Sequence, residues 1–231
     1  SQEIAIAAAL SGDELLWDAY HTGDPYLAFA IAAGLAPPDA TKQTHKAIRN
    51  RCKAVVLGTN YGMSAYGVAQ AAKIHELEAK ALLQKHRETY RKFWAWAENN
   101  KDRGLLGLKL ETCFGWPIRV TSGDVKANTF LNWPMQAHGA EMMRLACILA
   151  VERGIKLCAP IHDALLIEAP SDQIDAEVVR LKECMSEASE AVLGNGKVCR
   201  VDADIVRYPD RYMDEHGQEM WDQIMGLLAQ T

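Results

Sequence analysis

The sequence predicts an α+β fold, with helices and short antiparallel strands in separate blocks of the chain. Long stretches rich in helix formers, the clearest of them at 75–100, alternate with turn signals. Two apolar stretches, 108–123 and 157–170, have instead the length and turn pattern of β-hairpins. We find no internal repeat and no low-complexity linker. The 231 residues therefore suffice for one large domain or two small ones with a buried core.

The first hundred residues are predicted to be helical, with breaks at glycine and proline. Ser11 is a suitable N-cap for a helix that ends before a turn at 21–25. Gly34 should end the next helix, and three glycines between 58 and 67 should end another. The later helices of this half are expected at 26–33, from 39 or 41 to about 57, from 64 onward, and at 75–100 with one break.

The second half of the chain combines the two hairpins with further helices. The first hairpin, within 108–123, should turn at Gly115. His162 and Asp163 should lie at or near the tip of the second hairpin. The remaining elements are expected at 124–153 (a helix, with Pro134 at its start or at a kink), 173–193 (a helix) and 199–208 (a strand).

Charge is distributed unevenly along the chain. The formal net charge is −5, but residues 41–103 hold 13 Lys and Arg against 5 Asp and Glu, a local balance of +8. The remaining residues hold 12 and 25, a balance of −13. Such a basic block can bind a polyanion while the whole chain stays acidic. The alternative is that these charges only solvate the outer faces of helices.

Cysteine usage and hydropathy exclude several classes of protein. The six cysteines are scattered without a C-x-x-C pair, which argues against a zinc knuckle or a disulfide framework and for reduced thiols. The sequence has no run of about 18 uncharged apolar residues and no basic start before its first apolar run. We therefore expect no membrane partner and a cytoplasmic location.

Four side chains recur at steps of four, which on a helix places them along one face. They are Arg49, Lys53, Leu57 and Tyr61. The two cations could clamp a triphosphate, Arg49 through its fork and Lys53 as a point charge. Leu57 and Tyr61, further along the face, could pack against a sugar and a base. The alternative is a surface helix whose C-terminal half enters the core.

Asp163 is the candidate metal ligand. Apolar strands on both sides would hold its carboxylate rigidly at the edge of a sheet. Mg²⁺ needs only one or two protein carboxylates when substrate phosphates and waters complete its shell. Taken alone, His162-Asp163 could be an ordinary polar turn. Together with the cationic helix face, it suggests nucleotidyl transfer assisted by two metal ions.

Five blocks of the chain, in order, resemble family A DNA polymerases, and together they cover nearly all of it. Arg49-x3-Lys53-x7-Tyr61-Gly62 resembles motif B of that family, the helix of the fingers that receives the incoming nucleotide. The other blocks are SQEIAIAAALSGD at the N-terminus (the back half of motif A), LETCFGWPIRV (the fingers hairpin), NWPMQAHGAEMMR at 132–144 (the palm helix) and IHDALLIEA at 161–169 (motif C).

The resemblance implies catalytic roles for residues of motifs B and C. Asp163 would be a metal-binding catalytic carboxylate. His162 would shape the turn and the site of the primer terminus, in contact with DNA. Arg49 and Lys53 would contact the phosphates of the dNTP, and Lys53 could also donate a proton to the leaving pyrophosphate. Two Mg²⁺ ions are expected in the complete enzyme.

The resemblance also implies residues that bind the rest of the nucleotide and the DNA. Glu3 aligns with a glutamate that blocks a ribose 2′-hydroxyl, and Tyr61 would sit by the nascent base pair. Leu57 stands where an aromatic residue is usual, and Tyr26 stands where a histidine usually approaches the phosphates. The two residues expected to reach the minor groove of primer–template DNA are Asn132 and Gln136.

Departures from the family pattern limit what this stretch alone should do. The motif A aspartate would lie three residues upstream of Ser1, and the thumb would precede it. We expect residues 1–231 alone to be inactive without that N-terminal portion. Ala164 stands where the family often has glutamate. Together with the departures at Leu57 and Tyr26, it suggests a divergent branch of phage type, in the cytoplasm of a bacterial or phage-infected cell.

The expected architecture is a helical fingers subdomain inserted in a palm that carries a small antiparallel β-sheet. Residues 1–20 would belong to the palm, 21–125 to the fingers and 126–231 to the palm again. The expected function is template-directed addition of dNTPs to a primer 3′-end. One alternative is a DNA- or nucleotide-binding module without catalysis, either a degenerate polymerase or half of a split one. A metal-dependent phosphohydrolase is disfavoured, because the sequence lacks the further His and Asp clusters it would need.

Overall fold

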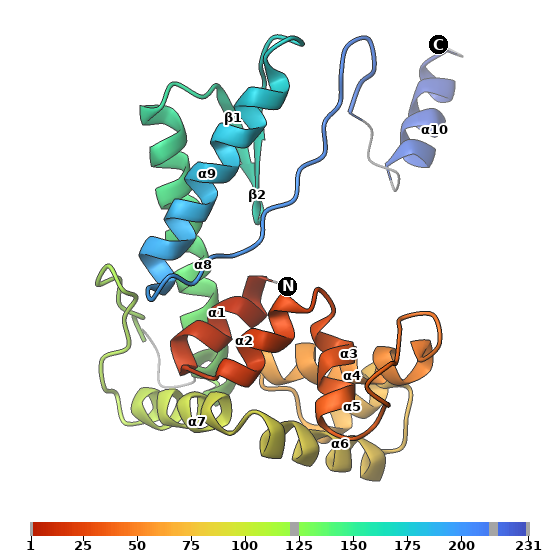
Figure 1. Cartoon of the computed structure of the whole chain (residues 1–231), viewed down its shortest axis with the longest axis vertical. Helices are drawn as coiled ribbons and strands as arrows, with labels where there is room; N and C mark the ends of the chain where they lie inside the picture. The colour runs from red at the N-terminus through yellow and green to blue at the C-terminus, as the bar shows by residue number, and fades with distance from the viewer. Residues whose placement is uncertain (1, 121–124, 213–216, 230–231) are drawn as a thin grey trace.

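The computed structural model describes residues 2–120, 125–212 and 217–229. Figure 1 shows two parts joined by one long helix, α8 (Ala127–Glu152). The lower part contains α1 to α7. The upper part contains the C-terminal half of α8, a β-hairpin and α9. Among the described residues, helices dominate and the hairpin is a small antiparallel sheet, which confirms the predicted fold class.

Side-chain caps fix the starts of several helices in the lower part. The Asp13, Asp24 and Ser64 side chains accept hydrogen bonds from backbone N–H groups at the starts of α2, α3 and α5. Ser11 is therefore not the N-cap that the sequence predicted, because it is the last residue of a preceding helix. The bounds are α1 Gln2–Ser11, α2 Glu14–His21, α3 Pro25–Ala32, α4 Lys46–Asn60, α5 Ala65–Ala72, α6 Glu76–Thr89 and α7 Arg91–Leu105.

In the upper part, α8 and α9 pack side by side and the hairpin contacts α8 (Figure 1). A small core fills the space between them, formed by Ala150, Ile155, Leu181 and Cys184. The strands pair in an antiparallel register, with Ile161 opposite Ala164 at the turn. The bounds are β1 Leu157–Ile161, β2 Ala164–Ile167 and α9 Ile174–Leu193, followed by α10 Gln218–Leu228, which the sequence did not lead us to expect.

Two predicted β segments do not form strands. Residues 199–206 lie outside any sheet in the described structure, so the predicted strand at 199–208 is wrong. The earlier hairpin is reduced to a single bridge between Glu111 and Pro117, although it does turn at Gly115 with φ of 81°. Pro117 has no N–H to extend the ladder. Residues 121–123 of that prediction lie outside the described residues.

The main core is centred on α1. Its residues Ile4–Ala8 are at most 1% exposed, and the helix packs against α2, α7 and α8. Because four of the ten residues of α1 are alanine, neighbouring helices can approach it from several sides. The buried helix therefore fixes the position of Glu3, near its N-terminus. None of the described helices is long and apolar enough to cross a membrane.

A single buried carboxylate caps two helices of this core. Asp13 is 3% exposed and lies in the short connection between α1 and α2. One of its oxygens accepts a hydrogen bond from the Leu16 N–H at 3.2 Å, in the first turn of α2. The other accepts from the Phe93 N–H at 3.1 Å, in the first turn of α7, eighty positions further along the chain. Asp13 thereby joins the start of the fold to α7.

Replacement of Asp13 by alanine should destabilise the chain by about 2–4 kcal/mol, because two helix caps are lost and buried N–H groups lose their acceptor. Ser64→Ala is the matched control, since Ser64 caps α5 alone and is exposed; it should cost about 1 kcal/mol. Urea unfolding gives both values. Equal losses for the two variants would contradict the double role of Asp13.

His86 lies in a closed aromatic cluster of the same core. It is 1% exposed, and its ring makes edge contacts with Phe29, Tyr90 and Phe93. Its Nδ1 accepts a hydrogen bond from the Trp94 indole N–H at 3.0 Å. Burial lowers the pKa of His86 to about 3, so the folded chain holds this imidazole neutral.

Acidification should therefore destabilise the fold through His86. Below its unfolded pKa near 6.5 the unfolded chain binds a proton that the folded chain does not bind until about pH 3. The free energy of unfolding should fall by about 1.4 kcal/mol for each pH unit below about 6. His86→Gln should flatten this dependence in urea titrations at several pH values, whereas His21→Gln, at an exposed position, should not. An unchanged slope in His86→Gln would exclude this origin.

Candidate nucleotide site

The four side chains that were predicted to share one helix face lie along α4 and at its C-terminus. Arg49, Lys53 and Leu57 are inside the helix, and Tyr61 is its C-cap residue. The helix runs three residues beyond its predicted end, so it positions all four of these side chains. Lys53 is exposed, Arg49 and Leu57 are partly buried, and Tyr61 is 43% exposed. This arrangement contrasts with a purely structural helix, whose repeating face would be apolar.

Arg49 and Lys53 meet two residues from the start of α3. The Arg49 Nε–H donates a hydrogen bond to a carboxylate oxygen of Asp24. The Tyr26 ring lies beside both cations, with its centroid 5.3 Å from the Arg49 Cζ and 5.9 Å from the Lys53 Nζ. These distances are those of cation–π contacts. The structure thus brings together three of the predicted nucleotide-binding residues and adds Asp24.

A second cluster forms around the Glu3 carboxylate. Its Oε1 accepts hydrogen bonds from the Tyr61 hydroxyl and from the Gln136 side-chain amide, the latter at 2.8 Å. The three side chains come from α1, from the end of α4 and from α8. The hydrogen bond to the Glu3 carboxylate is the main cause that raises the pKa of Tyr61 to about 12. Glu3, Tyr61 and Gln136 therefore form one polar site.

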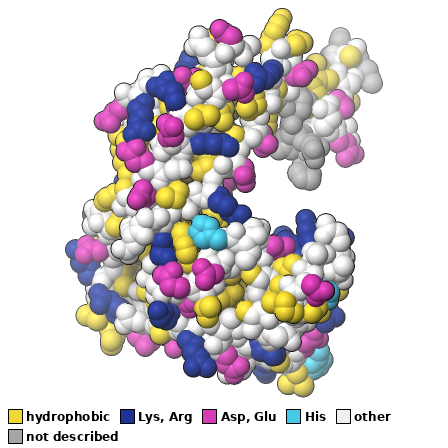
Figure 2. Space-filling model, in the orientation of Figure 1, with side chains coloured by type: hydrophobic (Ala, Val, Ile, Leu, Met, Phe, Trp, Pro, Cys, Tyr) yellow, Lys and Arg dark blue, Asp and Glu magenta, His cyan; other side chains and the backbone are white. Residues whose placement is uncertain are grey.

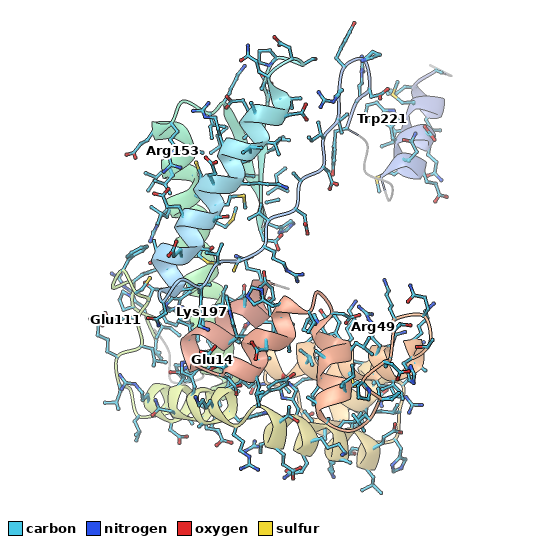
Figure 3. All side chains as sticks on the ribbon, viewed as in Figure 1. Glu14, Arg49, Glu111, Arg153, Lys197 and Trp221 are labelled. Carbon is cyan, nitrogen blue, oxygen red and sulfur yellow. The ribbon has the colours of Figure 1, made fainter. Side chains whose placement is uncertain are left out.

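The two clusters adjoin at Tyr26. Burial raises the pKa of the Tyr26 phenol, Arg49 opposes that rise, and the Asp24 and Glu3 carboxylates add to it. Charged groups of both clusters therefore affect the pKa of this phenol. Figure 3 shows Arg49 at the upper edge of the lower part, and Figure 2 shows that the surface is deeply notched between the lower and upper parts.

A tight glycine turn fixes Tyr61 relative to α8. Gly62 has φ of 63°, and a Cβ there would lie 2.7 Å from Asn128 Cγ and 3.0 Å from Leu131. The Asn128 amide donates to the Gly62 carbonyl at 2.8 Å. Asn132, one turn further along α8, has a buried side-chain oxygen without a hydrogen bond among the described residues. Of the two residues predicted to reach the minor groove, Gln136 is exposed and Asn132 is only partly exposed.

His162 and Asp163 lie at the tip of the β1–β2 hairpin, as predicted, and both are exposed. His162 takes a left-handed backbone conformation, with φ of 55°. Asp163 lines a cavity of about 800 Å³ that Gln2, at the start of α1, and Asp202 also line. No hydrogen bond or ion pair joins either tip residue to α4 within the described chain. The described part of the chain contains no group of three or more His, Cys, Asp or Glu that could hold a metal ion.

Sequence reasoning missed Asp24 as a member of the site. The residue stands 25 positions before its partner Arg49, so helix spacing could not reveal the pair. A usable signal was present, because Asp24 precedes Pro25 and is the kind of residue that caps a helix with proline at its first position. The contact of Asn128 with Gly62 had no comparable signal in the sequence.

Comparison with known proteins decides the family. The model of DNA polymerase family A matches residues 1–203. This chain belongs to that family. DNA polymerase I, thermostable, of Thermus thermophilus is 29% identical over 199 residues, which cover 80% of this chain and 24% of that protein. DNA polymerase I of Caldicellulosiruptor bescii is 29% identical over 202 residues, covering 80% of this chain and 23% of that protein.

A solved structure supports the same relationship. The POL domain of Pol1 from M. smegmatis, in complex with DNA primer-template and dNTP, is 26% identical with a TM-score of 0.70. The alignment covers 81% of this chain and 35% of that one. This family A chain thus spans about a quarter of the length of the curated polymerases it matches. Residues 204–231, including α10, lie beyond the match to the family model.

The Glu3–Tyr61 contact can be tested by the ionisation of Tyr61. In Glu3→Gln the phenol loses its charged acceptor, and the pKa of Tyr61 should fall from about 12 towards its ordinary value of 10. NMR titration of tyrosines labelled at the ζ carbon measures this shift. Glu14→Gln is the control, because Glu14 pairs with Lys197 instead. A pKa of Tyr61 that is the same in both variants would contradict the hydrogen bond.

Proposed function

We propose that this chain forms the nucleotide-binding and catalytic part of a DNA-directed DNA polymerase, which adds dNTPs to a primer 3′-end on a DNA template. The carrying observation is the pair of adjoining clusters, one around Arg49 and Tyr26 and the other around Glu3, on a chain of family A. The similar solved structure contains primer-template DNA and dNTP, which is consistent with this proposal.

The first cluster would bind the triphosphate. Arg49 and Lys53 are one helical turn apart on α4 and share the Tyr26 ring, so both charges are directed to one region. Arg49 would contact phosphate oxygens through its terminal nitrogens. Lys53 makes no ion pair within the described chain, and its ammonium group would neutralise charge and donate a proton to the leaving pyrophosphate.

The second cluster would bind the sugar, base and primer–template. The Glu3 carboxylate, held by Tyr61 and Gln136, would exclude a ribose 2′-hydroxyl by occupying its space. Tyr61 would lie against the nascent base pair and Leu57 beside the sugar. Gln136 would reach the minor groove, where its amide can donate or accept a hydrogen bond. Asn132 would join it only after its buried side-chain oxygen is exposed.

Asp163 would supply a ligand to Mg²⁺, with His162 shaping the turn beside the primer terminus. An exposed carboxylate on a rigid hairpin fits a metal that keeps waters and binds substrate phosphates, although it fits as one ligand and not as a complete site. Two bound Mg²⁺ ions would favour attack of the primer 3′-oxygen on the α-phosphate and departure of pyrophosphate. The remaining ligands would come from the upstream portion expected from motif A.

The proposed division of the chain is palm for 1–20, fingers for 21–125 and palm for 126–231. In this division α1 is a palm helix buried between both subdomains, since it packs against α7 and α8. The second cluster then spans both subdomains, because Glu3 belongs to the palm and Tyr61 to the fingers. A movement of one subdomain relative to the other would change the second cluster first.

Binding of dNTP to residues 1–231 tests the first part of this proposal. Arg49→Ala and Lys53→Ala should each weaken binding at least tenfold, because each removes a charge-assisted contact to phosphate. Arg51→Ala is the matched control, since Arg51 lies on the same helix and pairs with Glu78. Isothermal titration calorimetry gives the affinities. Equal affinities for all three variants would exclude α4 as the phosphate site.

The same experiment extends to catalysis in a longer protein that includes the upstream portion. Asp163→Asn should lower the rate of primer extension by about a thousandfold or more while dNTP binding is retained. Activity that survives this substitution would remove Asp163 from the metal site. A chain that binds DNA and dNTP but never extends a primer, even with the upstream portion, would support a binding module without catalysis.

A further inference from the structure

Asp24 is held in place from two sides. One carboxylate oxygen accepts a hydrogen bond from the Leu27 N–H at 3.2 Å and so caps α3. The other accepts the Arg49 Nε–H from α4. The carboxylate is only partly exposed, and the two helices that it joins pack against each other. Its position is therefore set by the backbone of α3 and not by Arg49 alone.

The Arg49 side chain is consequently fixed by one edge. Its Nε is occupied by Asp24, while its two terminal nitrogens make no hydrogen bond within the described chain. A guanidinium group presents five N–H donors in a rigid plane, so fixing Nε also fixes the direction of the opposite edge. The Tyr26 ring beside Cζ limits rotation further. The two terminal nitrogens of Arg49 therefore keep a fixed direction and can donate two parallel hydrogen bonds to one anion.

We propose that Asp24 is the positioning residue of the phosphate site: it holds the Arg49 fork in the direction in which it binds a triphosphate. This inference rests on the proposed function, because the anion that fits is the triphosphate of the nucleotide. Asp24 itself touches no substrate. It acts on affinity by removing the cost of ordering a long side chain at the moment of binding.

The Asp24 carboxylate also repels a bound phosphate, because both are anions. It lies behind the guanidinium group, so a bound phosphate is separated from it by the whole width of that group. At physiological ionic strength the Debye length is about 8 Å, and repulsion over such a distance is weakened by solvent and salt. The ordering of Arg49 does not depend on salt. At 0.15 M salt and above, ordering should therefore dominate.

The test compares Asp24→Asn with Glu78→Gln in the 1–231 chain. Asparagine caps a helix as well as aspartate, so α3 keeps its cap while the charge that holds Arg49 is lost. Inorganic tripolyphosphate and dNTP should both bind about 2- to 10-fold more weakly to Asp24→Asn at about 0.15 M salt. Glu78→Gln breaks the Arg51 pair on the same helix and should leave both affinities unchanged.

A second measurement reports the arginine directly. In a ¹⁵N-labelled chain the Arg49 Nε–H should exchange slowly with solvent, and Asp24→Asn should abolish this protection whereas Glu78→Gln should not. In a longer protein that extends primers, Asp24→Asn should raise KM for dNTP and leave kcat within about twofold, as expected for a lost binding contact. A purely structural role would instead reduce the amount of folded protein with KM unchanged.

The outcomes separate this inference from the proposed function. If Asp24→Asn loses the protected Nε–H signal but binds tripolyphosphate and dNTP as the unsubstituted chain does, the positioning role is wrong and the proposed function stands. Tighter binding by Asp24→Asn at 0.15 M salt also overturns it, since repulsion would then dominate. If the unsubstituted chain binds neither ligand, the proposed function fails and this inference fails with it.

Discussion

The arrangement of the lower part depends on one buried carboxylate, that of Asp13. Two helix N-termini, those of α2 and α7, converge on it, and each brings N–H groups and a partial positive charge that the folded chain must satisfy without water. The carboxylate satisfies both at once. It also fixes the corner where α1 ends, and α1 packs against α2, α7 and α8. A local capping interaction thereby determines the long-range position of the core helix.

The site follows from that position. Because α1 is buried between its neighbours, Glu3 is presented at a fixed point where the end of α4 and the middle of α8 also arrive. Glu3 then accepts hydrogen bonds from Tyr61 and Gln136, and its charge reaches Tyr26 in the adjoining cluster. The glycine turn after α4 makes the approach possible, since a side chain at Gly62 would collide with Asn128. The packing of α1 in the core thus also determines where Glu3, Tyr61 and Gln136 meet.

Local patterns in the sequence were sufficient for most helices and for the hairpin that carries Asp163, because caps, glycines and periodicity act over a few residues. They were insufficient where distant segments decide. A strand at 199–208 has the right composition, but strands need a partner, and the described chain offers it none. Ser11 and Asp13 are both good caps by type, but α1 continues through Ser11, so Asp13 is the residue that caps α2. The family resemblance supplied roles for residues, whereas the pairing of Asp24 with Arg49 required the structure.

The charge balance of the basic block shows how structure changes the meaning of a count. Several of its cations are neutralised by carboxylates of the same region, namely in the pairs Arg51–Glu78, Lys80–Glu76 and Arg87–Glu98. These pairs lower the positive charge that residues 41–103 present to a ligand. Lys53 forms no such pair in the described chain, and Arg49 is paired through one edge only. Other cations of the block, such as Lys46 and Lys92, also form no ion pair in the described chain, and what distinguishes Lys53 is that it shares the Tyr26 ring with Arg49. The proposed triphosphate site needs these two side chains and not a uniformly basic surface.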